Sequence, residues 1–101
     1  MYLLGYDIGS SSVKAALVDA VTGKCVASDF FPKNEAPIKA LRQGWAEQEP
    51  ANWWKYLKEA TASVLAQSKI DPTTIKAIGI SYQMHGLVAI DKDHNVLRDA
   101  I

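Results

Sequence analysis

Short runs of apolar residues, interrupted by small and polar ones, fill the first third of the chain and are typical of β-strands. Residues 2–8, 13–19 and 24–31 form three such runs, separated by a serine-rich turn and a Thr-Gly turn. Because both connections are short, these strands are expected to pair as an antiparallel meander.

The spacing of apolar residues becomes helical after Glu49-Pro50. One stripe recurs at steps of four, three and four residues, and a second row broadens it. The stripe comprises Trp53, Leu57, Ala60 and Val64, and the second row comprises Trp54, Thr61 and Leu65. Proline fits the first turn of a helix, and Asp71-Pro72 would end it. One helix over residues 50–68 is therefore predicted, with one face on the sheet.

The residues after this helix predict a further strand over 75–81, which a helical crossover would make parallel to an earlier strand. Residues 87–90 and 96–97 flank a polar turn and predict a hairpin. Residues 32–44 contain two prolines and no clear period, which indicates a surface connection. The whole order predicts an α/β fold with a mixed sheet and one main helix.

One helix can cover only one face of this sheet, whereas the strand at 75–81 carries apolar side chains on both faces. An apolar face of several hundred Å² is rarely left in water. The chain is therefore expected to associate with itself as a homo-oligomer.

Composition narrows the class of protein. The 101 residues, 49% hydrophobic and 22% charged, suffice for one small domain. Eleven basic and eleven acidic residues leave no net charge, so neither nucleic acid nor an anionic membrane is an expected partner. A single cysteine, Cys25, fits a reducing compartment and is expected to be a small buried residue. With no apolar leader or membrane-length segment, a cytoplasmic location is predicted.

The turn between the first two strands could bind phosphate. Its residues are a carboxylate, a glycine, small hydroxyl residues and a nearby lysine: Asp7, Gly9, Ser10, Ser11, Ser12 and Lys14. Backbone N–H groups of such a turn can converge on phosphate oxygens, and a carboxylate can hold Mg²⁺. Neither G-x-x-x-x-G-K-[ST] nor G-x-G-x-x-G is present. Composition alone favours the plainer alternative, a hairpin turn with a solvated aspartate.

A second candidate group, Gln83, Met84 and His85, follows the strand at 75–81. Ligands of open α/β sheets bind beyond the carboxyl ends of strands. Glutamine and histidine donate and accept hydrogen bonds, as sugar hydroxyls require. The alternative is a surface loop whose histidine is merely polar.

Two other patterns suggest binding sites that we reject. The tryptophans Trp45, Trp53 and Trp54 have no basic residues interleaved, so they indicate packing at the helix rather than base stacking. The turn at 91–95 imitates the start of a calcium loop, but Val96 stands where glycine is required.

Taken together, three stretches resemble the FGGY carbohydrate kinases, of the actin-like ATPase superfamily with its ribonuclease-H-like fold. Asp7-Ile8-Gly9-Ser10 resembles the phosphate loop of that family. Residues 45–50 resemble its tryptophan–acid–proline stretch before the first helix, and Gln83-Met84-His85-Gly86 is typical of its xylulokinase members. The resemblance extends over residues 2–101 and identifies 1–101 as the amino-terminal part of the family's N-terminal domain.

This resemblance implies ATP and Mg²⁺ as cofactors and a ketose as substrate, with D-xylulose converted to D-xylulose 5-phosphate. It implies that Asp7 assists Mg²⁺-ATP and phosphoryl transfer, that residues 9–12 bind phosphate with Lys14 nearby, and that residues 83–85 bind the sugar. Ser12 replaces a glycine common in xylulokinases. The family's catalytic base and adenosine pocket lie far beyond residue 101, so residues 1–101 alone are expected to be inactive. Gluconate or ribulose kinases and a non-catalytic actin-like module remain alternatives.

Overall fold

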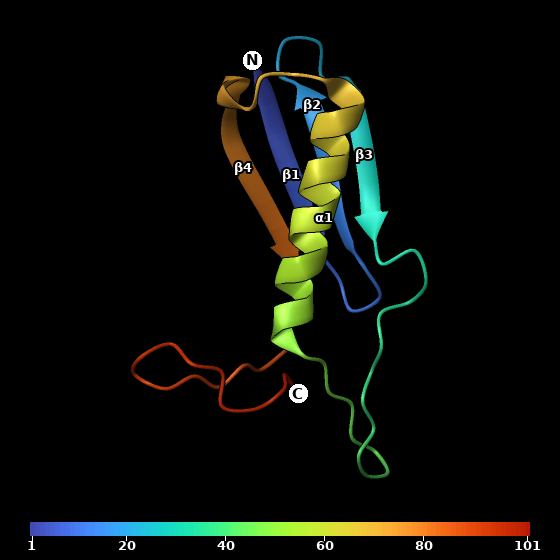
Figure 1. The fold of residues 1–101 in the computed structure, drawn as a ribbon, viewed down its shortest axis with the longest axis vertical. Helices are drawn as coiled ribbons and strands as arrows, with labels where there is room; N and C mark the ends of the chain where they lie inside the picture. Colours follow the sequence, from blue (N-terminus) through green and yellow to red (C-terminus); the bar gives the residue numbers. More distant parts are fainter.

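The computed structural model describes all 101 residues and contains one four-stranded sheet and one long helix (Figure 1). The elements are β1 (Tyr2–Ile8), β2 (Val13–Asp19), β3 (Cys25–Phe31), α1 (Pro50–Ser68), the 3₁₀ helix η1 (Pro72–Thr74) and β4 (Ile75–Tyr82). The strand order is β3-β2-β1-β4, with β1 and β4 parallel and the other pairs antiparallel. The predicted meander, single main helix and parallel strand are confirmed, with element bounds within one residue.

The core lies between α1 and the face of the sheet that it covers. Its buried members are small or aliphatic: Leu4, Ala15, Leu17, Ala27, Ala60 and Val64. The predicted helical stripe accounts for Ala60 and Val64, whereas Trp54 is exposed. Trp54 lies on the same side of α1 as Thr61 and Leu65, which are half-buried, but it stands near the start of the helix, where that side is exposed. The expectation that Trp54 broadens the packed face is wrong.

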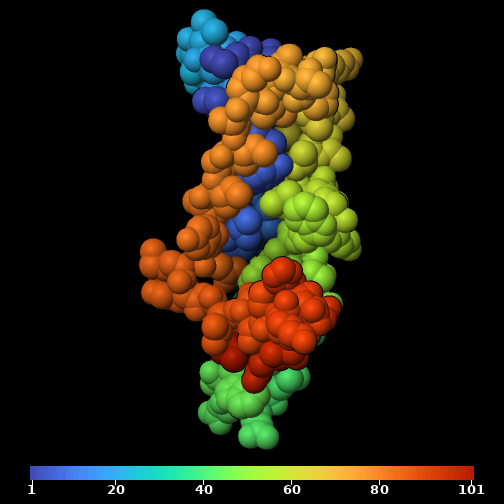
Figure 2. Space-filling view, turned by 90° about the vertical axis from the view of Figure 1, so that its left-hand side faces the viewer, coloured from blue at the N-terminus to red at the C-terminus, as the bar shows by residue number.

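The helix covers only part of one face, because α1 lies over β2 and β3 and scarcely reaches β1. The register places Ile78, Ile80 and Tyr82 of β4 beside Leu4, Tyr6 and Ile8 of β1, on the same face as α1. Those three side chains of β4 are nevertheless 60%, 57% and 69% exposed. Figure 2 shows β4, in orange, along the flank of the molecule with no segment over it.

Cys25 is exposed, contrary to the expectation that it is buried. It is the first residue of the edge strand β3 and pairs with Val18 at a register irregularity. Burial on this strand begins only at Ala27. Position at the start of an edge strand thus outweighs the usual preference of a free cysteine for the interior.

The hairpin expected near the carboxyl end forms only in part. Ile90 pairs with Val96, and the Leu97 N–H donates to the Ala89 carbonyl at 2.9 Å. The pairing is one isolated bridge rather than two regular strands. Asp91 stabilises the turn by accepting from the N–H groups of Asp93 and Asn95.

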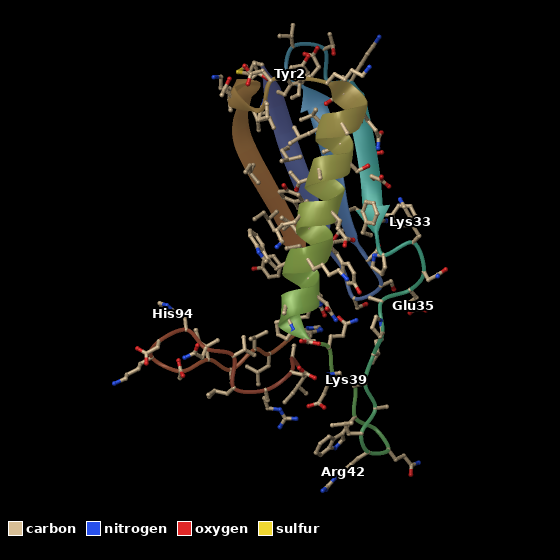
Figure 3. All side chains as sticks on the ribbon, viewed as in Figure 1. Tyr2, Lys33, Glu35, Lys39, Arg42 and His94 are labelled. Atoms are coloured by element: carbon tan, nitrogen blue, oxygen red, sulfur yellow. The ribbon has the colours of Figure 1, made fainter.

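Residues 32–49 and 83–101 both extend beyond the lower end of the sheet in Figure 1, where β1 and β4 end. Figure 3 shows Lys39 and Arg42 along the first of these segments and His94 at the far tip of the second. Paired backbone hydrogen bonds join Lys39 to Glu47 and Gln48 to Ala100. No helix is both long and apolar enough to cross a membrane.

Candidate functional site

The two stretches singled out from the sequence meet at the carboxyl ends of β1 and β4. These strands are parallel neighbours, and Ile8 is paired with Tyr82 at their ends. The Gln83 N–H continues the pairing by donating to the Ile8 carbonyl at 3.1 Å. The turn at 9–12 and the loop at 83–86 therefore begin side by side, where ligands of open α/β sheets bind.

The turn at 9–12 is tight and requires its glycine. The Gly9 N–H donates to the Ser12 carbonyl at 3.0 Å. A Cβ atom at position 9 would lie 3.1 Å from that same oxygen, closer than most real contacts. Glycine thus lets the two strands reverse within four residues.

Every carbonyl of the three serines in this turn is held by another part of the protein. The Ser10 carbonyl accepts from Gln48 Nε2 at 2.6 Å, and the Ser11 carbonyl accepts from the Ala36 N–H at 2.8 Å. The Ser12 carbonyl accepts from Gly9.

The backbone N–H groups of Ser10, Ser11 and Ser12, by contrast, donate to no protein acceptor. In a trans peptide unit the carbonyl and the N–H point in opposite directions. The Ser10 and Ser11 carbonyls, drawn towards the protein, therefore direct the N–H groups of Ser11 and Ser12 away from it. Successive free N–H groups of this kind can bind an anion such as phosphate.

Asp7 and Lys14 lie outside this turn, on the face of the sheet that α1 does not cover. They are opposite one another in the β1–β2 register, and both are exposed. Ser81, on the neighbouring β4, donates from its hydroxyl to Asp7 Oδ1 at 3.2 Å. No group of three or more His, Cys, Asp or Glu side chains is arranged to hold a metal. The single exposed carboxylate of Asp7 nonetheless suits Mg²⁺, which is usually bound through one or two carboxylates, waters and phosphate oxygens.

A hollow of about 270 Å³ lies at the junction of the turn and the loop. Its wall is formed by Ser10, Ile38, Ala46, Glu47, Gln48, Trp53, Gln83, Met84, His85, Gly86, Ala100 and Ile101. All three residues expected to bind the substrate are therefore in one wall. Gln83, which lines this hollow, has a side-chain Nε2 that is buried and donates to no protein acceptor, so one donor of this residue is unused. Met84 and His85 are exposed.

The structure does not bring all the expected site residues into one cavity. Ser10 is the only residue of the expected phosphate loop in the wall of this hollow. Ser11 and Ser12 line a separate hollow of about 290 Å³, together with Lys33 and its neighbours. Asp7, Gly9 and Lys14 line neither. Ser10 thus stands between a side suited to phosphate and a side suited to hydroxyl groups.

Two buried polar residues of the wall, Glu47 and Gln48, belong to the stretch at 45–50 but were not expected from the sequence to be site residues. Glu47 is 4% exposed and pairs with Arg98, which ties the segment at 83–101 to the entry of α1. Gln48 accepts from the Trp53 indole N–H at 3.0 Å and donates to Ser10. The sequence shows Glu47 and Gln48 between Trp45 and the start of α1, but this pattern does not indicate which residues they bind.

Comparison with known proteins extends these observations. Residues 2–101 match the model of the N-terminal domain of the FGGY family of carbohydrate kinases. A xylulose kinase of Bacillus subtilis (strain 168) is 38% identical over 100 residues, which is 99% of this chain and 19% of that protein.

Solved structures with a similar fold are also sugar kinases. A crystal structure described as a xyloylose kinase from Brucella ovis superimposes with a TM-score of 0.89 at 35% identity, over 100% of this chain and 20% of that one. A gluconate kinase from Lactobacillus acidophilus superimposes with a TM-score of 0.84 at 32% identity, over 99% of this chain and 19% of that one. The chain thus spans about a fifth of the length of these relatives. With a family match over nearly all its residues, the chain belongs to the FGGY family of carbohydrate kinases.

Proposed function

We propose that the chain is the amino-terminal part of an ATP-dependent kinase that converts D-xylulose to D-xylulose 5-phosphate. One observation carries the proposal: Ser10, from the turn with free backbone N–H groups, lines the same hollow as Gln83, Met84 and His85. Phosphoryl transfer depends on holding a phosphate and an accepting hydroxyl next to one another. This junction supplies both sides of that arrangement.

On the phosphate side, the N–H groups of Ser10, Ser11 and Ser12 would donate hydrogen bonds to the terminal phosphates of ATP. The orientation of the Ser11 and Ser12 N–H groups is set before any ligand arrives, because the Ser10 and Ser11 carbonyls of the same peptide units are already hydrogen-bonded. Such preorganised donors stabilise charge that develops during transfer. Asp7 would hold Mg²⁺, which neutralises charge on the phosphates, and Lys14 would add positive charge nearby.

On the sugar side, Gln83 and His85 would bind hydroxyl groups and Met84 would contact the carbon chain. Gln83 Nε2 is a hydrogen-bond donor without an acceptor in the protein. A site built to hydrogen-bond a hydroxyl group discriminates strongly against ligands that lack it. The xylulose kinases among the relatives support a ketose.

Two alternatives are distinguishable by experiment. One alternative is another sugar, such as gluconate, ribulose or a related compound, and the likeness to a gluconate kinase supports gluconate. A non-catalytic actin-like module would keep the phosphate turn but would not need an unpaired amide in the adjoining hollow.

The test is turnover by the full-length protein that carries these residues. ADP release with Mg-ATP is measured against D-xylulose, D-ribulose, gluconate and glycerol, and kcat/KM is expected to be highest for D-xylulose. A higher value for another sugar assigns that sugar instead, and no turnover with any of them supports the non-catalytic module. Residues 1–101 alone are expected to give no turnover, since phosphoryl transfer needs groups on both sides of a closing cleft.

A further inference from the structure

Gln48 is a buried amide at the junction of the two sides of the site. It is 9% exposed and lines the hollow. Burying an amide without partners costs free energy, but both ends of this one are satisfied. Nε2 donates to the Ser10 carbonyl at 2.6 Å, and Oε1 accepts from the Trp53 indole at 3.0 Å.

The chemistry of the two partners allows only one orientation of this amide. An indole N–H can only donate, and a backbone carbonyl can only accept. The side chain at position 48 must therefore present an acceptor towards Trp53 and a donor towards Ser10. A carboxylate would serve Trp53 alone, and an apolar side chain would serve neither.

The backbone of Gln48 is hydrogen-bonded as well as its side chain. The Gln48 N–H donates to the Ala100 carbonyl at 3.0 Å, and the Ala100 N–H donates back at 2.7 Å. Gln48 therefore reaches Ser10 from a backbone that is itself anchored within the wall of the hollow.

The bond to Ser10 sets the direction of a phosphate-binding group. The Ser10 carbonyl and the Ser11 N–H belong to the same planar peptide unit and point in opposite directions. By drawing the carbonyl towards itself, Gln48 turns the Ser11 N–H away, towards the side where Ser11 lines the second hollow. Without that bond, this peptide unit would be free to rotate.

We propose that Gln48 is a positioning residue that aligns the turn at 9–12 for phosphoryl transfer, an inference that rests on the proposed kinase function. It touches the sugar side through Trp53 and the phosphate side through Ser10, so it links the two. The amide itself acts on the direction of the Ser11 N–H.

The first test is Gln48→Met in the full-length protein, which keeps length and volume but removes both hydrogen bonds. Loss of alignment should lower kcat about tenfold to a hundredfold. The sugar KM should stay within about threefold, because the groups that contact the sugar remain. The control is Gln43→Met, the same change at an exposed position of the same segment, which should leave both constants unchanged. A kcat for Gln48→Met within about twofold of the wild type overturns the assignment.

The second test, Gln48→Glu, gives a pH dependence that a merely structural role would not produce. A carboxylate cannot donate to Ser10, but a protonated carboxyl can. Burial beside a carbonyl oxygen raises the pKa of a carboxyl, so protonation should occur within the range where activity can be measured. The turnover of Gln48→Glu relative to the wild type should therefore rise as the pH falls from about 8 to about 5.5. Gln48→Met should show no such recovery, and a flat ratio for Gln48→Glu overturns the assignment.

Other titrating groups cannot produce the recovery of Gln48→Glu at low pH relative to the wild type, because the wild type contains the same groups. Those around Gln48 are Glu47 and its partner Arg98, the neighbouring Glu49, His85 across the hollow and Tyr56 in an adjoining small cavity. Dividing by the wild-type rate at each pH cancels their contribution. If Gln48→Met fails to fold, the pH profile of Gln48→Glu decides alone.

A binding measurement separates this inference from the proposed function. If the wild type phosphorylates no sugar, the proposed function fails, and calorimetry with a non-hydrolysable Mg-ATP analogue then tests Gln48. Gln48→Met should weaken that binding at least about fivefold, since one phosphate-facing N–H is no longer aligned. Equal affinities, or no binding by either protein, overturn the assignment.

Discussion

The two halves of the sheet differ in what covers them. Over β2 and β3, α1 buries Leu17 and Val64 completely. Beside them, β4 leaves Ile78, Ile80 and Tyr82 open on the same face. The candidate site begins where β1 and β4 end. Packing is thus concentrated in one half of the sheet, while the chemistry lies at the end of the other.

The two halves differ because one helix is narrower than a four-stranded sheet. An α-helix with its side chains is about 10–12 Å across, and neighbouring strands lie about 4.8 Å apart. One helix therefore covers about two strands and the near side of β1, where Leu4 is buried, and leaves β4 open. The difference between the halves can be tested residue by residue.

The largest effect on stability is expected from Leu17→Ala, in the covered half. Removing a fully buried leucine side chain leaves a cavity and should lower the free energy of unfolding by about 3 kcal/mol. Urea denaturation of residues 1–101 measures the change. A loss below about 1 kcal/mol would mean that the core relaxes around the gap and that the covered half is less rigid than its packing indicates.

The largest effect on chemistry is expected from Asp7→Ala, at the end of the open half. In the full-length protein, removal of this carboxylate should lower kcat about a hundredfold or more, because charge stabilisation of metal and phosphate is lost. The sugar KM should hardly change. Steady-state kinetics with both substrates checks this, and turnover within about threefold of the wild type would remove Asp7 from that role.

His85→Ala in the full-length protein should separate the sugar side from the phosphate side. Loss of one hydrogen bond to the substrate should cost about 1–3 kcal/mol, which would raise the sugar KM but not the ATP KM. Michaelis constants for both substrates decide the matter. An equal rise in both would show that His85 shapes the loop rather than contacts the sugar.

A smaller effect, dependent on pH, is expected from Asp29→Asn on the covered side of β3. Hydrogen bonds from Lys33, then from Ser63 and the Phe30 N–H, lower the pKa of Asp29 from 3.8 to about 2. A lowered pKa stabilises the fold above the unfolded-state value, and this contribution is lost as the pH falls from about 4 towards 2. Asp29→Asn should therefore be less stable than the wild type by about 1 kcal/mol at neutral pH.

The difference should shrink as acid protonates the wild-type aspartate, and thermal unfolding at pH 7 and pH 3 follows it. A difference that stays constant with pH would mean that the amide disturbs packing and that the charge is unimportant.

The smallest effect on stability is expected from Ile80→Asp, in the open half. The side chain is already mostly in water, so the free energy of unfolding of the monomer should change by less than about 0.5 kcal/mol. Self-association of residues 1–101 should nevertheless weaken, since burial of apolar area is worth about 25 cal/mol per Å². Light scattering behind a sizing column measures both proteins. A wild-type chain that elutes as an 11.1 kDa monomer at high micromolar concentration would contradict self-association through this face.

Periodicity in the sequence was enough to predict the elements and their order. The short apolar runs over residues 2–8 and 13–19 and the stripe through Ala60 and Val64 reflect local geometry, which each segment carries within itself. Short connections then required antiparallel pairing, and the helical crossover required β4 to be parallel to an earlier strand. The predicted burial was wrong where it depends on position in the sheet: Cys25 was expected to be buried but is exposed at the start of the edge strand β3.

The candidate site could be anticipated only as separate pieces. The turn with Ser10 and the loop with Gln83 were recognisable from their residue types, but their adjacency follows from the pairing of β1 with β4. The roles of Glu47 and Gln48 depend on partners 51 and 38 residues away, Arg98 and Ser10. A hydrogen bond between residues so far apart in the sequence produces no periodic pattern of residue types. Only the folded chain brings its donor and acceptor together. The local elements were thus determined by the sequence alone, whereas the tertiary structure decided which polar groups face one another.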